Sequence, residues 1–258
     1  MTRYLFGDSD VAERRLKILA DVYADSTASF VLGAVDEKPR LLLDLGCGPG
    51  YTTHLLADVL GCKQAAGLDN SRHFINTARK SATARVSFHL HDVTRVPFPV
   101  APADLLFCRF LMTHLRDPEV LLSRWATQLN SGGLLLMEEV EGIQTSNKSF
   151  ISYLEIVEAM IKAQKGNLYI GPILNEMKIP ETLKIVSSAV KRLSVPAHKA
   201  ASMFSLNIET WKHVPFVLAN YSSSLIEDLE KTLKRLAVKT GAGSKIEWQL
   251  RQIVFERR

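Results

Sequence analysis

The sequence predicts an α/β fold: a doubly wound, mostly parallel seven-stranded sheet with a helical N-terminal segment and a helical insertion after strand five. Apolar, strand-like runs alternate with helical stretches between residues 41 and 138. A glycine-rich turn, G-C-G-P-G, directly follows the first of these runs. Two further segments of alternating character, residues 187–195 and 246–255, complete the seven strands. Strand–helix alternation with short connections is typical of right-handed crossovers and of a parallel sheet covered on both faces.

Helical spacing begins near residue 10. Val11, Ile18 and Leu19 recur on one face of the segment that starts at Asp10, and this aspartate is a suitable N-cap. A second helical stretch covers residues 26–35. Both stretches precede the first strand, so residues 1–38 form a separate helical segment.

Five strands fit into residues 39–140. Their continuous apolar character, as in L-L-L and D-L-L-F-C, is typical of strands that are buried on both faces. The expected strands are residues 41–45, 64–68, 86–90, 103–108 and 134–137. The expected helices are residues 52–60, a helix that is capped by Ser71 and ends near residue 81, and a helix that starts at Asp117-Pro118 with proline in the first helical position.

The rhythm of strands and helices stops after Glu141. Apolar residues recur at helical spacing over residues 150–163, and Gly171-Pro172 and Pro180 then predict short helices or loops. A helical region with a break near Pro215 runs to about residue 239. Because no linker or internal repeat divides the chain, we predict one domain. Its parts are residues 1–38, 39–140, 141–186 (an insertion) and 187–258.

The composition is that of an ordinary globular protein, with 47% apolar and 23% charged residues. Three scattered cysteines without a C-x-x-C pair argue against disulfides and zinc and favour a cytoplasmic location. No run is long enough for a signal peptide or a membrane span. Residues 1–140 hold 15 basic and 16 acidic residues, and residues 141–258 hold 17 and 11. The basic second half permits a nucleic-acid partner, but its lysines are spread out as on an ordinary solvated surface.

The glycine-rich turn predicts a nucleotide site. In an open parallel sheet, ligands bind beyond the carboxyl ends of the strands, and glycines there let a nucleotide approach the backbone near a helix N-terminus. The dinucleotide fingerprint G-x-G-x-x-G requires glycine where this chain has Tyr51. Asp44, two residues before the first glycine, is badly placed for a pyrophosphate and well placed for a cationic ligand.

The stretch L-L-D-L-G-C-G-P-G-Y resembles motif I of the class I S-adenosylmethionine-dependent methyltransferases. Four further motifs follow in the order of that family: G-L-D-N-S, H-D-V-T-R, A-D-L-L-F-C-R-F-L-M-T-H and L-N-S-G-G-L-L-L-M-E-E. The resemblance covers about residues 40–140 and is closest in style to the small-molecule and quinone-biosynthesis members. It implies S-adenosylmethionine as the methyl donor.

The resemblance also implies a set of cofactor-binding residues. Asp69 takes the ribose hydroxyls, Asp92 the exocyclic amine of the adenine, and the backbone of Val93 the adenine ring. Arg109 is expected to pair with the cofactor carboxylate. Residues 1–38 form an N-terminal helical lid. The remaining expected cofactor contacts are Tyr4, Asp44, Gly46, Cys47, Gly48, Gly50, Asn70 and Cys108.

Two residues are candidates for a catalytic role. His114 follows the fourth strand and has a side chain that can take a substrate proton, although the preferred interpretation is a histidine at a helix start that has no chemical role. Glu138, with its neighbours Glu139 and Glu141, is a candidate for orienting the substrate; the alternative is a solvated acidic lip. We expect no metal site, because His89 and His91 share one strand face and are interpreted as ordinary core or surface residues.

The predicted function is methyl transfer to an oxygen or nitrogen atom of a small organic acceptor. The insertion, residues 141–186, is the expected substrate cap, because the shared core leaves nothing else to confer specificity. One alternative is an RNA or protein methyltransferase that uses the basic second half, although the chain carries no N-P-P-Y-like motif after strand four. Another is a protein that binds the cofactor without transferring a methyl group. A membrane or nucleic-acid partner is not expected, and a homodimer is left open.

Overall fold

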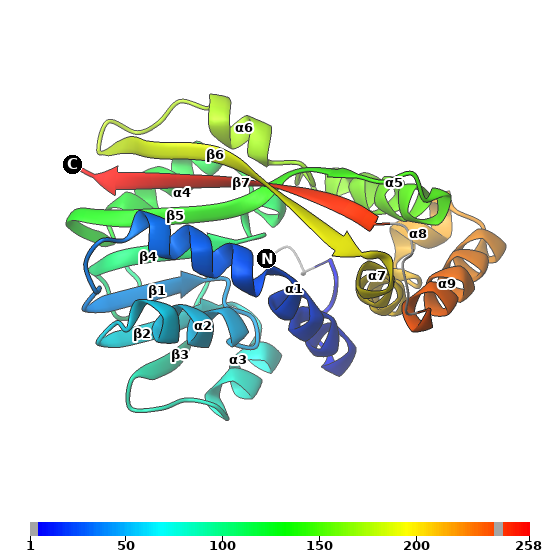
Figure 1. Cartoon of the computed structure of the whole chain (residues 1–258), viewed down its shortest axis with the longest axis horizontal. Helices are drawn as coiled ribbons and strands as arrows, with labels where there is room; N and C mark the ends of the chain where they lie inside the picture. The colour runs from blue at the N-terminus through cyan, green and yellow to red at the C-terminus, as the bar shows by residue number, and fades with distance from the viewer. Residues whose placement is uncertain (1–4, 240–244) are drawn as a thin grey trace.

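The computed structural model describes residues 5–239 and 245–258, so that Tyr4 lies outside the described residues. One seven-stranded sheet forms the centre of the fold, in the order β3-β2-β1-β4-β5-β7-β6 (Figure 1). Neighbouring strands from β3 to β5 are parallel, and β7 runs antiparallel between β5 and β6. The strands are β1 (Leu41–Leu45), β2 (Gln64–Asp69), β3 (Val86–Leu90), β4 (Ala103–Arg109), β5 (Leu129–Gln144), β6 (Leu183–Pro196) and β7 (Lys245–Arg257). The predicted α/β fold class is confirmed.

Helices cover both faces of the sheet and one of its ends. Apolar residues of α1, α2 and α3 pack on one face, and those of α4 and α6 pack on the other. The segments α5, α7, α8 and α9 gather beyond the end of the sheet, at the right of Figure 1, around a third core. The helices are α1 (Asp10–Ala34), α2 (Tyr51–Leu60), α3 (Arg72–Arg79), the short 3-10 helix η1 (Met112–His114), α4 (Pro118–Ala126), α5 (Lys148–Ala163), α6 (Gly171–Glu176), α7 (Ala197–Trp211), α8 (Pro215–Asn220) and α9 (Ser223–Val238).

The first helix differs from the prediction. The two expected stretches are one continuous helix, α1, of 25 residues, and its N-cap is Ser9, whose hydroxyl accepts from the Ala12 N–H. Ser26 and Thr27, which a sequence reading places at a break, are buried within α1 and packed against the sheet. Tertiary burial thus overrides the weak helix propensity of these two residues.

The fifth strand is longer than predicted. It runs for 16 residues, because β7 pairs with it from Leu134 to Gln144. Glu138 and Glu139 therefore lie within the strand and are 0% exposed, instead of forming a solvated lip beyond it. A second local difference concerns Asp117, which precedes α4 in a left-handed conformation and makes no side-chain capping bond.

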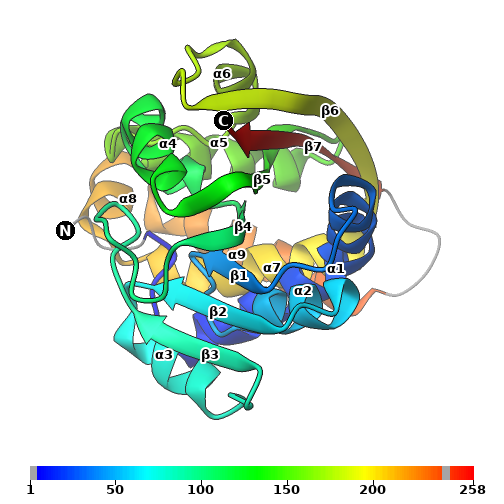
Figure 2. The ribbon, with the colours of Figure 1, turned by 90° about the vertical axis from the view of Figure 1, so that its left-hand side faces the viewer.

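The strand order places a ligand crevice between β1 and β4. From β1 the chain proceeds outward to β2 and β3, then returns to β4 on the other side of β1. The connections that follow β1 and β4 therefore diverge and leave an opening at the carboxyl ends of these strands, which is where open α/β sheets bind ligands. Figure 2 shows the sheet from a second direction, with α2 and α3 beside β1, β2 and β3.

Candidate active site

A cavity of about 380 Å³ lies at this crevice. Such a volume falls within the range of small-molecule sites, roughly 300–1,000 Å³. One part of its wall is polar and comes from the glycine turn and from residues that follow β2 and β3. Another part is apolar and comes from α5, α7 and β7. α1 also lines the cavity, through Arg15, Leu16, Leu19, Ala20 and Tyr23.

The glycine turn joins β1 to α2 and forms the floor of the polar part. Gly46, Gly48 and Gly50 all have positive φ values, of 72°, 52° and 90°. Gly48 lines the cavity, and a Cβ there would be 3.5 Å from the Leu16 side chain at the nearest. Gly50 instead faces the protein, where a Cβ would lie 2.6 Å from the Phe88 ring. Glycine at position 48 therefore leaves space in the cavity, whereas glycine at position 50 is needed for packing against Phe88 of β3.

We expect Gly50→Ala to lower the free energy of unfolding by about 1–3 kcal/mol, because the new methyl group meets the Phe88 ring and the backbone is left-handed. Gly33→Ala is the matched control: Gly33 lies in α1 and a Cβ there meets nothing within 4 Å. This control should be neutral or slightly stabilising. Urea unfolding of both variants checks the prediction, and equal stabilities would contradict it.

Asp69 ends β2 and faces the cavity. Its two carboxylate oxygens accept hydrogen bonds from the backbone N–H groups of Gly48 (2.9 Å) and Ser71 (2.8 Å), which fixes the carboxylate beside the glycine turn. Burial raises the pKa of Asp69 from its ordinary value, and the backbone hydrogen bonds oppose this rise. Each carboxylate oxygen has further lone pairs, so the group can also accept two hydroxyls of a ligand.

Asp92 lies on the same wall, after β3. Its Oδ1 accepts from the backbone N–H of Thr94 at 3.0 Å and from the Thr94 hydroxyl at 2.7 Å, and both residues line the cavity. Its neighbour Val93 is buried in the core beneath, and the Val93 carbonyl accepts from the Trp125 indole. Asn70 also lines this wall.

Arg109 brings a buried positive charge to the cavity. Its guanidinium donates to the hydroxyls of Thr27 (2.7 Å) and Thr52 (2.9 Å), and it lies over the rings of Tyr23 and Phe110. Burial lowers the pKa of Arg109 from its usual value, while the nearby Glu138 and Asp44 carboxylates raise it. A guanidinium has five N–H donors, so a group that already binds two hydroxyls can still take a ligand carboxylate.

Several predicted site residues lie behind the cavity wall. Asp44 accepts from the Thr53 hydroxyl at 2.7 Å, and burial raises its pKa to about 7. Glu138 accepts from Ser26, Thr27 and the Gln252 side chain, at 3.1, 2.5 and 2.7 Å. The predicted residues that line the cavity are Gly46, Cys47, Gly48, Asp69, Asn70, Asp92, Arg109 and His114. Those outside its lining are Asp44, Gly50, Val93, Cys108 and Glu138.

The turn after β4 carries His114 to the cavity. The His114 ring lies edge-on to Phe6, with 5.7 Å between ring centres. Burial, and to a lesser extent the nearby Arg15 charge, lowers the pKa of His114 to about 4. The imidazole is therefore neutral at pH 7 and a weak base, which makes it poorly matched to removing a substrate proton there.

Glu139 holds this turn in place, a role that the sequence reading does not include. Its Oε1 accepts from the backbone N–H groups of Leu111 (2.8 Å) and Met112 (3.0 Å). Burial raises the pKa of Glu139 to about 8 despite these bonds. The signal in the sequence is the pair E-E after an apolar strand, but the hydrogen bonds depend on the tertiary fold.

We expect the stability of the protein to fall as pH rises from about 5 to 8. Between these values Glu139 is protonated in the folded state, with a pKa of about 8, and ionised in the unfolded state. The unfolded state then binds fewer protons, so the free energy of unfolding decreases by about 1.4 kcal/mol per pH unit and per such group. Glu139→Gln should remove the contribution of Glu139 to this pH dependence of the free energy of unfolding. The contribution of Asp44, whose pKa is raised to about 7, should remain in the variant below pH 7. Unfolding curves at several pH values check this, and parallel profiles for the two proteins would contradict it.

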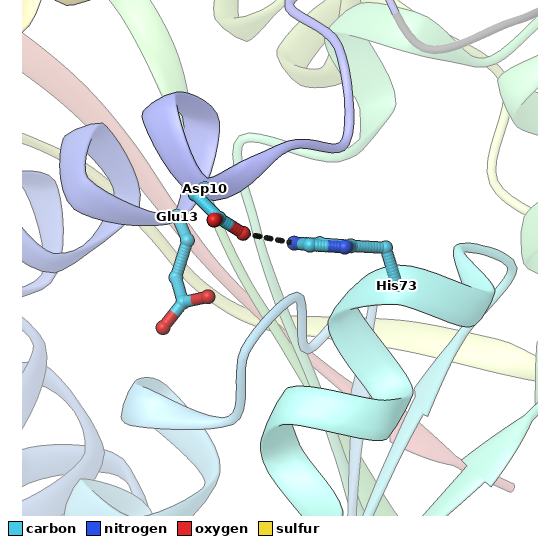
Figure 3. A group of neighbouring side chains, drawn as sticks. All are labelled: Asp10, Glu13 and His73. Atoms are coloured by element: carbon cyan, nitrogen blue, oxygen red, sulfur yellow. Dashed lines mark ion pairs between the residues drawn. The ribbon is translucent and has the colours of Figure 1, made fainter.

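The first turn of α1 is tied to α3 beside the polar part of the cavity (Figure 3). His73 Nε2 lies 3.4 Å from the Asp10 carboxylate. Glu13 accepts from the hydroxyls of Tyr51 (3.4 Å) and Thr77 (3.2 Å). The side chains of Asp10, Glu13 and His73 offer ligand atoms within 4.8 Å of one another. Because these atoms already have protein contacts, we interpret the group as a latch between α1 and α3.

The geometry fits S-adenosylmethionine, since a fixed carboxylate, a glycine turn and a buried guanidinium meet in one cavity at the switch point of the sheet. Residues 42–133 match the family model for a methyltransferase domain. Among the described residues, no helix is long and apolar enough to cross a membrane.

Curated relatives match about two fifths of the chain. The trans-aconitate 2-methyltransferase of Rhizobium leguminosarum is 35% identical over 104 residues, which are 40% of this chain and 39% of the relative. That of Methylobacterium radiotolerans is 36% identical over 102 residues, which are 40% and 38%. The match thus spans about two fifths of the length of these relatives.

Solved structures extend the likeness in fold to nearly the whole chain. Geranyl diphosphate C-methyltransferase of Streptomyces coelicolor has a TM-score of 0.51 at 15% identity, over 98% of this chain and 87% of that one. Coclaurine N-methyltransferase has a TM-score of 0.53 at 14% identity, over 91% and 72%. At such low identities the likeness concerns the fold alone.

Proposed function

We propose that this protein transfers a methyl group from S-adenosylmethionine to an oxygen or nitrogen atom of a small organic acceptor. The observation that carries the proposal is one cavity with two kinds of wall: its polar part holds the glycine turn, Asp69 and Asp92, and its apolar part is lined by residues of α5, α7 and β7. The structures of geranyl diphosphate C-methyltransferase and coclaurine N-methyltransferase, which share the fold, both contain S-adenosylhomocysteine. This supports the choice of cofactor.

The residues that line the cavity have two proposed roles, which are to bind the cofactor and to limit the access of water. Asp69 accepts the ribose hydroxyls, Asp92 faces the adenine amine, and Arg109 pairs with the cofactor carboxylate. When bound, S-adenosylmethionine supplies a methyl group that is activated by its positive sulfur. Positioning of two reactants can account for about 7–11 kcal/mol of barrier lowering. α1 lines the cavity, and we expect it to limit the access of water to the reacting atoms.

The first experiment is a thermal shift with S-adenosylhomocysteine, S-adenosylmethionine and NAD in parallel. A ligand at about 100 times its Kd stabilises the folded state by about 2.7 kcal/mol. We expect a rise in melting temperature with the two adenosyl ligands and none with NAD. A rise with NAD alone, or no response to the adenosyl ligands, contradicts the proposal.

Release of S-adenosylhomocysteine in the presence of an acceptor then separates methyl transfer from binding alone. A panel of small acids, phenols and amines tests the small-molecule activity, and total RNA and a protein extract test the alternative substrates. We expect release with members of the first panel only. Binding without release from any of them identifies a cofactor-binding protein that transfers no methyl group. Release with RNA or protein alone favours the macromolecular alternative.

A further inference from the structure

The apolar part of the cavity has a distinct chemistry, and we call it the acceptor chamber. Its walls come from the N-terminal segment, the turn after β4, α5, α7 and β7. Aromatic rings face it from several of these elements: Phe6, Phe110, Tyr153, Phe204 and Trp248. Tyr153 and Phe204 are stacked, with 3.9 Å between ring centres and 15° between ring planes. Aromatic walls of this kind favour a flat, apolar ligand, because ring faces and edges pack well against one another.

One buried hydroxyl on the chamber wall has no partner. Thr113 is 4% exposed, lines the cavity, and its Oγ1 forms no hydrogen bond within the described part of the chain. The Thr113 backbone is firmly held, since its carbonyl accepts from the Asn167 N–H at 3.2 Å and Glu139 binds the two preceding N–H groups. A buried polar group without a partner destabilises the folded state, because it has lost its hydrogen bonds to water. A ligand that binds this hydroxyl removes that cost.

The charged groups of the cavity are unevenly distributed: the carboxylates lie in its polar part, and a guanidinium lies near the chamber. Among the described residues that line the whole cavity, the carboxylates are Asp69 and Asp92, which follow β2 and β3 in the polar part. Arg15 lines the cavity near His114, the residue after Thr113, and its guanidinium lies 5.4 Å from the centre of the Phe6 ring. The chamber thus offers a positive charge and a neutral hydroxyl to a ligand, and no acid to a positively charged amine.

We propose that the acceptor is an apolar, ring-bearing molecule with one acidic oxygen group, a carboxyl or a phenol, and that the Thr113 hydroxyl binds the oxygen that is methylated. This rests on the proposed function and names its substrate class. A tricarboxylate does not fit, because the chamber is mostly apolar and would bury several negative charges against the single positive charge of Arg15. We therefore expect a substrate that differs from that of the trans-aconitate 2-methyltransferases, which match about two fifths of the chain.

Methyl transfer to an acidic oxygen group does not require a strong base from the protein. An acidic group loses its proton to solvent before or during binding, and the positive charge of Arg15 favours the ionised form. The acceptor oxygen supplies the electron pair of the new C–O bond, and the pair of the broken C–S bond stays on sulfur. The products are a methyl ester or a methyl ether and S-adenosylhomocysteine. This agrees with the weak basicity of His114.

The test uses a pair of probes that differ in the sign of their charge: cinnamic acid, which is an anion at pH 7, and cinnamylamine, which is a cation of nearly the same shape. trans-Aconitate is the tricarboxylate control. Each is added to wild-type protein saturated with S-adenosylhomocysteine. We expect cinnamate to raise the melting temperature further and to bind at least tenfold more tightly than the other two. With S-adenosylmethionine, methyl cinnamate and S-adenosylhomocysteine should form in equal amounts.

Thr113→Val removes the hydroxyl at almost constant shape, and Thr113→Ser retains it. Cinnamate affinity should fall roughly tenfold or more in Thr113→Val and remain within about threefold of wild type in Thr113→Ser, with unchanged affinity for S-adenosylhomocysteine in both. Cinnamate that binds no better than the amine or the tricarboxylate overturns the inference, as does equal loss in both variants. Absence of S-adenosylhomocysteine binding by wild type instead overturns the proposed function.

Discussion

Asp69→Ala is expected to weaken S-adenosylhomocysteine binding by about two to four orders of magnitude. The carboxylate is fixed between the N–H groups of Gly48 and Ser71, and it faces the cavity. Two ribose hydroxyls bound to one ionised group contribute about 1.5–3 kcal/mol each, or roughly 3–6 kcal/mol together. The substitution also leaves the Gly48 and Ser71 N–H groups without their present acceptor. Isothermal titration calorimetry on wild type and variant measures the effect.

Asp58→Asn is the control for this experiment. Asp58 pairs with Arg85 on the exposed side of α2, and exposed pairs of this kind contribute about 0–1 kcal/mol. The control should bind S-adenosylhomocysteine like wild type and unfold at nearly the same denaturant concentration. If Asp69→Ala folds normally and binds S-adenosylhomocysteine as tightly as wild type, Asp69 does not bind the ribose and the assignment is wrong.

Glu138→Ala should lower the free energy of unfolding by about 3–5 kcal/mol. Glu138 is 0% exposed and accepts hydrogen bonds from Ser26 and Thr27 of α1 and from Gln252 of β7, so it joins the first helix to the sheet. Thr27 also accepts from Arg109, and loss of the Glu138 carboxylate leaves this buried guanidinium without its largest favourable charge. Breaking one partner out of a buried charged network is strongly destabilising.

Glu256→Ala is the matched control, because Glu256 lies on β7 and pairs with Lys184 at the surface of the sheet. It should change stability by no more than about 1 kcal/mol. The pair of variants also separates two roles for Glu138. If Glu138 orients the substrate without a structural role, Glu138→Ala retains wild-type stability and loses turnover alone; urea unfolding and an S-adenosylhomocysteine release assay distinguish the two results.

The sequence predicts those parts of the site whose structure depends on residues nearby in the chain. β3 has the predicted bounds, the Ser71 cap forms as expected, and the glycine turn, Asp69 and Asp92 follow strands whose ends an apolar run defines. Glu138 and Glu139 could not be placed in this way. Their burial arises from the pairing of β5 with β7, more than 100 residues later, and from the packing of α1.

The sequence predicts a substrate cap in residues 141–186, but it does not indicate which residues outside this insertion line the chamber. Thr113 is conspicuous only because the folded chain leaves its hydroxyl without a partner, which no pattern of residue types reveals. Tyr153 lies within residues 141–186, the predicted substrate cap, whereas Phe204 and Trp248 lie in α7 and β7, and no pattern in the sequence indicates that the three share one wall. They also lie outside residues 42–133, the segment that matches the methyltransferase family model, so the likeness carries little information on the acceptor.

The latch between α1 and α3 has a kinetic consequence. α1 lines the cavity along several of its turns, and its N-terminal end is held by contacts from Asp8 to Ser71, from Asp10 to His73 and from Glu13 to Thr77. We expect a bound nucleotide to leave by displacing part of α1, and these polar contacts between the N-terminal end of α1 and α3 oppose that movement. We therefore expect product release to be the rate-limiting step of turnover. The residence time of the product should depend on the side chains that join α1 to α3, which do not contact the reacting atoms.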